Sequence, residues 1–210
     1  HPVAHSFPTR RSSDLAVSVQ PATIDFEIGL EIEDGDVLPS ALSKGLDKAF
    51  QYNYRGLEFL DRGEFDSALV LFEKARAAFP GYIDAENNIG VVHYRKGILF
   101  RAEDIWKAII TREPSYTLAY YNLAMLHFHE KEYTRAEKRV REAITRNKKL
   151  IQPHILLGKI HIARNDTRAA LRDFRNAYKI DKNDQDAWSH YAYGLIVSGD
   201  TAEAESILAD

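Results

Sequence analysis

Residues 117–150 read TLAYYNLAMLHFHEKEYTRAEKRVREAITRNKKL, and the pattern of this stretch recurs along most of the 210-residue chain. One alanine of the stretch belongs to a series with a constant step of 34 residues, which comprises Ala68, Ala102, Ala136, Ala170 and Ala204. A period of this length is typical of arrays built from pairs of helices. We therefore predict an all-α protein in which each helix pair packs against its neighbours along the chain.

Two further series with the same step indicate how the helices of one pair touch. Small residues form the first series, Gly56, Gly90, Ala124, Gly158 and Ala192. Large apolar residues dominate the second series, Phe72, Trp106, Val140, Phe174 and Leu208. Small residues let two helices approach to the ~8–10 Å interaxial distance of packed helices. The two series therefore predict a close helix crossing in every unit.

Short breakers separate the predicted helices. Gly63, Gly97, Asn165 and Gly199 each follow a helical stretch, and Gly or Asn there accommodates a left-handed cap. Asp66, Asp166 and Asp200 come directly before or within the start of the next helix, so we expect them to act as N-terminal caps.

The repeat resembles that of the tetratricopeptide repeat family. Trp188, the run YYNLA at 120–124 and the unit-closing Pro80 match the family pattern, whereas Glu86 and His154 replace its aromatic residue. The resemblance implies an α-solenoid, a right-handed superhelix of antiparallel helix pairs. Its repeats are expected at 49–82, 83–116, 117–150 and 151–184, with an incomplete repeat at 185–210.

The region before the repeats has a different pattern. Residues 5–15, HSFPTRRSSDL, resemble a translated sequencing adapter, so we treat residues 1–15 as an artefact that we expect to be disordered. Apolar and polar residues then alternate over residues 24–33, which is typical of a half-buried strand. We interpret residues 16–42 as an extended or β segment and linker, the end of a truncated upstream region. A helix is predicted from Ser43, so the array spans residues 43–210.

Composition argues against several classes of partner. The chain has 28 basic and 31 acidic residues, a net charge of −3, and this balance does not favour nucleic acid. No apolar run approaches the ~20 residues of a membrane span. The chain contains no cysteine, which excludes disulfides, thiolate metal sites and a cysteine nucleophile. The sequence does not identify the compartment.

The histidines raise the question of a metal site. His93, His127 and His161 lie one period apart, where the family usually has tyrosine. Successive first helices lie on the order of 10 Å apart, so these rings cannot share one ion. We interpret them as core residues and predict no metal and no cofactor. Motifs for catalysis are also missing from the sequence, so we predict no enzymatic activity.

The resemblance implies that first-helix positions line a concave groove that binds a partner. Mapped onto this sequence, the groove residues are Asn53, Leu57, Leu60, Asn87, Val91, Tyr94, Arg95, Leu118, Tyr121, Met125, Phe128, His129, Ile155, Lys159, Ile162, Ser189 and Tyr193. Tyr94, Tyr121, Met125 and Phe128 form its apolar centre, and an apolar patch with a polar rim marks a binding site. The positions that carry the family's carboxylate clamp hold Asn53, Leu57 and Leu118, which do not fit it.

The leading hypothesis is therefore a non-catalytic scaffold whose partner is another protein, contributing an apolar or aromatic peptide or helix. In one alternative, residues 16–48 of this chain fill the groove themselves. A second is that the array is the substrate-docking or regulatory arm of a larger enzyme, for example a glycosyltransferase. A third is self-association through an uncapped C-terminal end near Leu195, Ile207 and Leu208.

Overall fold

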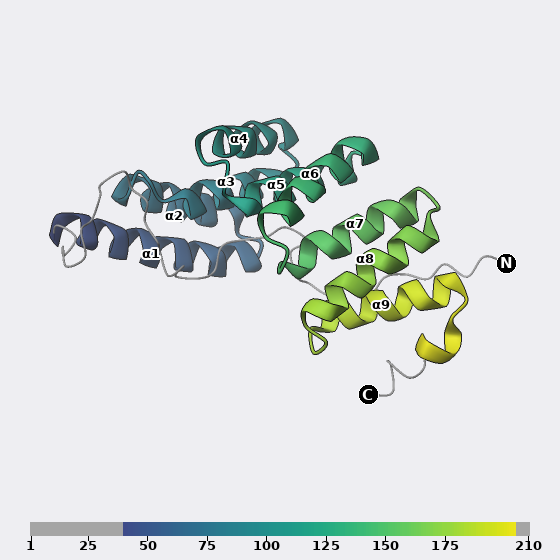
Figure 1. The fold of residues 1–210 in the computed structure, drawn as a ribbon. Helices are drawn as coiled ribbons and strands as arrows, with labels where there is room; N and C mark the ends of the chain where they lie inside the picture. The colour runs from purple at the N-terminus through teal and green to yellow at the C-terminus, as the bar shows by residue number, and fades with distance from the viewer. Residues whose placement is uncertain (1–39, 205–210) are drawn as a thin grey trace.

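The computed structural model describes residues 40–204 (Figure 1). This part of the chain consists of helices joined by short turns, and it contains no strand. The helices are α1 (Ser40–Asp61), α2 (Phe65–Ala78), α3 (Ile83–Arg95), α4 (Leu99–Arg112), α5 (Thr117–His129), α6 (Tyr133–Arg146), α7 (Ile151–Ala163), α8 (Thr167–Ile180) and α9 (Gln185–Ser198). Residues 201–204 begin a further helical segment.

The helix boundaries follow the sequence period. Helices α3, α5, α7 and α9 begin at residues 83, 117, 151 and 185, which are separated by one period each. Helices α2, α4, α6 and α8 begin at residues 65, 99, 133 and 167 with the same step. The predicted all-α solenoid of repeated helix pairs is confirmed.

Contacts between the helices are local along the array. Each described helix packs against the helices next to it, and each first helix also contacts the first helix of the following unit. Among the described helices, no contact joins elements further apart than that. Figure 1 shows the resulting succession from α1 to α9, in which each unit adds to the end of the previous one. Such an array is stabilised by nearest-neighbour interfaces, with no single central core.

The crossing of the two helices in a unit pairs a small residue with a large one. A Cβ atom added to Gly56 would lie 2.6 Å from the Phe72 ring, and one added to Gly158 would lie 2.3 Å from the Phe174 ring. Both rings are fully buried. The large side chain therefore occupies the space that the glycine leaves, as the two sequence series predict.

The turn inside each unit requires a left-handed residue at its centre. The φ angles at Gly63, Gly97, Asn165 and Gly199 lie between 62° and 94°. Glycine and asparagine adopt this region at little cost, so the prediction for these four positions is confirmed. Lys131 occupies the equivalent position of the third unit with φ 62°, and the sequence analysis did not identify it.

Two local predictions differ from the structure. Helix α1 begins at Ser40, three residues before the predicted start at Ser43. Asp166 accepts a hydrogen bond from the Ala169 amide at 3.0 Å and so caps α8 as expected. Asp66, in contrast, lies inside α2 and pairs with Lys96, so its side chain does not cap the helix.

Some predictions concern residues that the structure does not describe. The artefact at 1–15 and the strand at 24–33 lie outside the described residues, as do Ile207 and Leu208 of the self-association hypothesis. Leu195, the described member of that group, is fully buried. None of the described helices combines the length and apolar character that crossing a bilayer requires.

Candidate protein-interaction groove

The predicted groove residues all lie on the first helices of the units. Eight are buried within the array: Asn53, Leu57, Leu60, Asn87, Val91, Tyr121, Met125 and Ile155. Seven are half-buried: Tyr94, Leu118, Phe128, Lys159, Ile162, Ser189 and Tyr193. Arg95 and His129 are exposed. The half-buried and exposed residues are the ones that a partner can touch without displacing the packing.

Two of the expected anchors are therefore part of the interior. Tyr121 is 5% exposed and Met125 is 7% exposed, whereas the sequence analysis placed both among the contacts of a partner. They lie on α5, whose residues from Ala119 to His127 are all buried. A helix that is apolar all round is covered on every side, and the sequence pattern does not show which side faces outward.

Three accessible aromatic rings among the predicted groove residues, those of Tyr94, Phe128 and His129, lie at the C-terminal ends of α3 and α5. The Tyr94 and His129 rings meet edge to face, with centroids 5.8 Å apart. Phe128 packs on Tyr133 of α6 at 5.8 Å. We call Tyr94, Arg95, Phe128 and His129 the aromatic patch. It combines two half-buried rings, those of Tyr94 and Phe128, with the exposed guanidinium of Arg95 and the exposed ring of His129.

A chain of buried asparagines supports these helices from inside. Asn88 donates to Asn53 Oδ1 at 2.9 Å, and Asn122 donates to Asn87 Oδ1 at 2.8 Å. Asn87 in turn donates to Asn88 Oδ1 at 3.3 Å, which links α1, α3 and α5 in one network. Buried amides are stable only when they are hydrogen-bonded. Asn53 and Asn87, predicted to face a partner, instead hold neighbouring units together.

The histidine series lies in the interior, as expected for core residues. His93, His127 and His161 are all buried, with exposures of 8%, 4% and 9%. Burial is the main cause that lowers the pKa of His93, and the nearby Arg101 and Lys96 lower this pKa further. Burial also lowers the pKa of His127, although the charge of Glu132 opposes the effect. These two rings are therefore neutral at pH 7.

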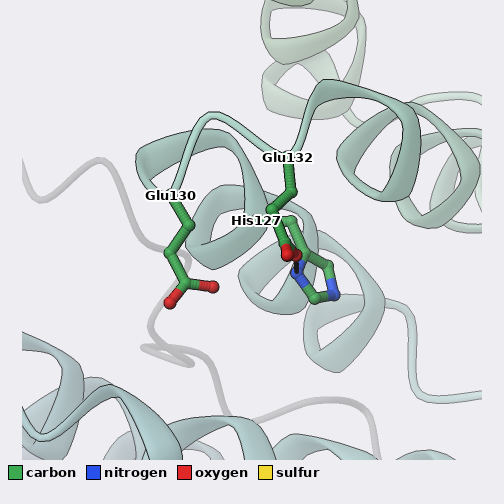
Figure 2. Close-up of side chains that lie close together, drawn as sticks. All are labelled: His127, Glu130 and Glu132. Atoms are coloured by element: carbon green, nitrogen blue, oxygen red, sulfur yellow. Dashed lines mark ion pairs between the residues drawn. The ribbon is translucent and has the colours of Figure 1, made fainter.

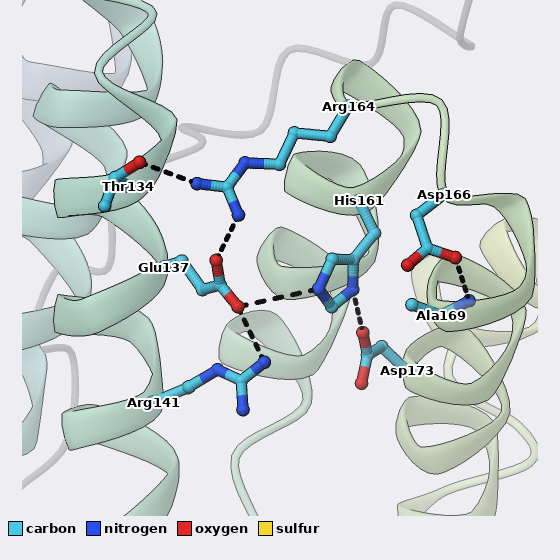
Figure 3. Close-up of polar contacts among 8 residues, drawn as sticks. All are labelled: Thr134, Glu137, Arg141, His161, Arg164, Asp166, Ala169 and Asp173. Carbon is cyan, nitrogen blue, oxygen red and sulfur yellow. Dashed lines mark hydrogen bonds and ion pairs between the residues drawn. The ribbon is translucent and has the colours of Figure 1, made fainter.

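His161 belongs to a polar cluster that joins α6, α7 and α8 (Figure 3). Its Nδ1 lies 2.6 Å from Asp173 Oδ2, and its Nε2 lies 3.7 Å from Glu137 Oε1. Glu137 also accepts from Arg141 at 2.6 Å and pairs with Arg164. The imidazole thus lies between two carboxylates from neighbouring units.

Burial and charge act in opposite directions in this cluster. Burial raises the pKa of Asp173, and the hydrogen bond to His161 offsets only part of that effect. Burial also disfavours the ionised form of Glu137, but the hydrogen bonds and charges of Arg141 and Arg164 outweigh it and hold the Glu137 pKa below its ordinary value. Glu137 is therefore ionised at pH 7 and joins α6 to α7 through Arg164.

The helix pairs, the 34-residue step and the small-to-large crossing agree with the result of a comparison with known families. Family models described as tetratricopeptide repeat match residues 55–106, 118–154 and 161–210. The chain is a tetratricopeptide repeat protein. Tetratricopeptide repeats form protein–protein interaction scaffolds, and this fold is typically non-catalytic.

Several solved structures share the tetratricopeptide repeat fold of this chain. A thermophilic tetratricopeptide repeat protein of Thermus thermophilus is 19% identical, with a TM-score of 0.65 over 77% of this chain and 88% of that one. PilF of Pseudomonas aeruginosa is 22% identical, with a TM-score of 0.67 over 78% and 75% of the two chains. MamA of Desulfovibrio magneticus is 16% identical, with a TM-score of 0.58 over 78% and 92%. At these identities the similarity concerns the fold. No curated protein matches the sequence.

Proposed function

We propose that this tetratricopeptide repeat array binds an apolar or aromatic peptide or helix of another protein at the aromatic patch. The observation that carries the proposal is the position of Tyr94 and Phe128, equivalent residues of α3 and α5 that are both half-buried. Partly exposed aromatic side chains on a rigid support are typical anchors of protein interfaces. The asparagine network and the buried α5 provide that support.

The charges beside the patch favour a particular kind of ligand. Arg95 is an exposed member of the patch, and Lys159 lies half-buried on α7, the next first helix. A segment with apolar anchors and a neighbouring acidic residue would match both features, because complementary charge at a rim orients a ligand. The remaining half-buried groove residues, Leu118, Ile162, Ser189 and Tyr193, extend this surface along the array.

A defined peptide tests the proposal better than capture from a cell extract. Peptides selected from a display library for binding to the full chain would be measured against the variant Phe128→Ala. We expect its affinity to fall by about tenfold or more, as for a buried aromatic anchor. The control variant is Phe100→Ala, because Phe100 is 65% exposed on α4, a second helix. Equal binding by all three proteins would overturn the assignment of the patch.

The alternative hypothesis of an enzyme's docking arm stays a prediction. A docking arm would use the same first-helix surface to bind a substrate protein, so the peptide experiment does not separate the two hypotheses. The sequence of the uninterrupted reading frame on both sides of residues 16–210 would separate them, since a catalytic domain in that frame would favour the docking arm.

A further inference from the structure

We propose that the turn between α5 and α6 binds a divalent transition-metal ion of the Zn²⁺ class through His127, Glu130 and Glu132 (Figure 2). The site shares no residue with the aromatic patch, and the proposal does not depend on the proposed function. Its ligands are one imidazole nitrogen and two carboxylate oxygens, and both donor types are common in zinc sites.

The three ligand atoms already lie close together. One nitrogen of His127 and one oxygen from each glutamate are all within 4.8 Å of one another. Two zinc bonds of ~2.0–2.2 Å span at most about 4 Å between ligand atoms. A small rotation of the Glu130 side chain, which is exposed, therefore brings the set within bonding range. Figure 2 shows the Glu132 carboxylate against the imidazole and Glu130 beside them.

The strongest indication is the state of the His127 ring. The residue is 4% exposed, and its buried Nδ1 atom forms an ion-pair contact with Glu132 Oε2 at 3.0 Å. This contact is not directed well enough to make a regular hydrogen bond, so Nδ1 has no well-aligned partner. A buried polar atom without a hydrogen bond is rare in proteins and often indicates an ion or a water. A metal ion between Nδ1 and the carboxylate oxygen would satisfy both atoms.

The charges around the turn favour a cation. Besides Glu130 and Glu132, Glu103 of α4 adds negative potential at His127, although it is paired with Lys107 at 2.6 Å. Arg135 opposes a cation, because it contacts both oxygens of Glu132 at 3.0 and 3.1 Å. The Arg135 side chain is 68% exposed, so it can turn into solvent when a metal binds.

The equivalent turns of the other units do not have this set of ligands. His93 is followed by Lys96 and Ile98 where the third unit has Glu130 and Glu132. His161 is followed by Arg164, and its Nδ1 is already bonded to Asp173. The three proposed ligands therefore occur together in one unit, and they do not recur at the 34-residue step as the histidines do.

The test is titration of the metal-free protein with Zn²⁺ alone. Calorimetry measures binding, and the ¹⁵N chemical shifts of the His127 ring show whether this residue is a ligand. We expect one ion to bind and to move the Nδ1 resonance. Glu130→Gln and Glu132→Gln should each weaken binding by at least roughly tenfold, a loss that even outer-shell changes cause. The matched control is Glu64→Gln, since Glu64 occupies the position of Glu132 two units earlier, where Phe59 replaces the histidine.

The outcomes are distinguishable. Glu130 is exposed, so its variant should fold like the wild type, and circular dichroism would verify this. Loss of binding in the Glu130 and Glu132 variants but not in Glu64→Gln supports the site. An unmoved His127 Nδ1 resonance, or wild-type affinity in both variants, would overturn it, including the case in which Zn²⁺ binds only to other histidines.

Discussion

The Trp106 side chain occupies the space beside Gly90, such that a Cβ atom added to Gly90 would lie 2.6 Å from Trp106 Nε1. The third unit has Ala124 and Val140 at the two equivalent positions, both fully buried. Where the first helix has alanine instead of glycine, the second helix therefore has valine instead of tryptophan. Within the described residues, the two sequence series give one pair of facing positions in each of the first four units, and this pair determines how closely the helices cross.

The first prediction concerns this pair. Gly90→Ala should destabilise the array by about 1–3 kcal/mol through overpacking, partly offset by roughly 1 kcal/mol of better helix propensity. The double variant Gly90→Ala with Trp106→Val recreates the pair of the third unit. Its loss should therefore be smaller than the sum of the single losses, by about 0.5–3 kcal/mol. Urea unfolding of the four proteins measures this coupling, and additive losses would contradict the prediction.

The second prediction concerns the asparagine network. Asn88→Ala removes the amide group that donates to Asn53 Oδ1 and the oxygen that accepts from Asn87. Two buried amides therefore each lose a hydrogen bond. We expect a loss of about 1–3 kcal/mol in the free energy of unfolding. Asn176→Ala is the control, because Asn176 is exposed on α8 and should change stability by less than about 0.5 kcal/mol. Similar losses from both variants would argue against a stabilising network.

The fold was predictable because it depends on local repetition. A constant step of 34 residues with Gly or Asn at the turns is enough to define helix pairs and their order. The surface was less predictable. A helical position shows which residues share a face, but whether Tyr121 or Asn87 faces a partner or the next unit depends on the rotation between units, which the repeat does not encode.

The turn of the third unit shows a second limit of the sequence analysis. Lys131 adopts φ 62° although it is neither Gly nor Asn, so its residue type gives no signal. Glu130 and Glu132 follow His127 by three and five residues across this turn, and residues five apart do not share a face of a helix. Only the folded turn brings them together, which is why the histidine was interpreted as a core residue alone.

The third prediction concerns pH. The pKa values of His93 and His127 are lowered by burial in the folded state, so between these values and the ordinary 6.5 the unfolded chain binds more protons. Stability should therefore rise as pH increases from 5 to 7 and be lost on acidification. Asp173 acts in the opposite direction, because its raised pKa makes the folded state bind a proton more readily than the unfolded chain. This effect begins at the ordinary value of 3.8 and extends upward to the raised pKa of the folded state, where it opposes the contribution of the histidines.

Urea midpoints at pH 5.0, 6.0 and 7.5 would measure this dependence. His93→Gln should make the urea midpoint change less with pH, because a side chain that does not titrate replaces one of the two buried rings. The comparison variant is His129→Gln, a substitution at an exposed position that leaves both buried rings in place and should keep the pH dependence they cause. Stability that falls between pH 5.0 and 7.5 would show that another group dominates.

The fourth prediction compares two carboxylates that form ion pairs. Glu137 contacts His161 and Arg164 across the interface between α6 and α7, and it also contacts Arg141 on α6 itself. Its side chain is 20% exposed. Glu137→Gln should lower the free energy of unfolding by about 1–3 kcal/mol, because a partly buried hydrogen bond between charged groups is lost. Glu73→Gln is the control. Its partner Arg76 lies three residues away on the same helix, and both side chains are more than 40% exposed, so the expected loss is about 0–0.5 kcal/mol.

Salt separates this ion-pair effect from simple loss of packing. Exposed pairs are screened within about 10 Å at 0.1 M ionic strength, whereas partly buried pairs are screened less. The difference in the free energy of unfolding between the wild type and Glu137→Gln should therefore persist at 0.5 M NaCl. Because Glu137 connects two units, the loss should also appear as faster amide exchange in α7 and α8 than in α1 and α2. Uniform exchange along the array would contradict a nearest-neighbour role for this carboxylate.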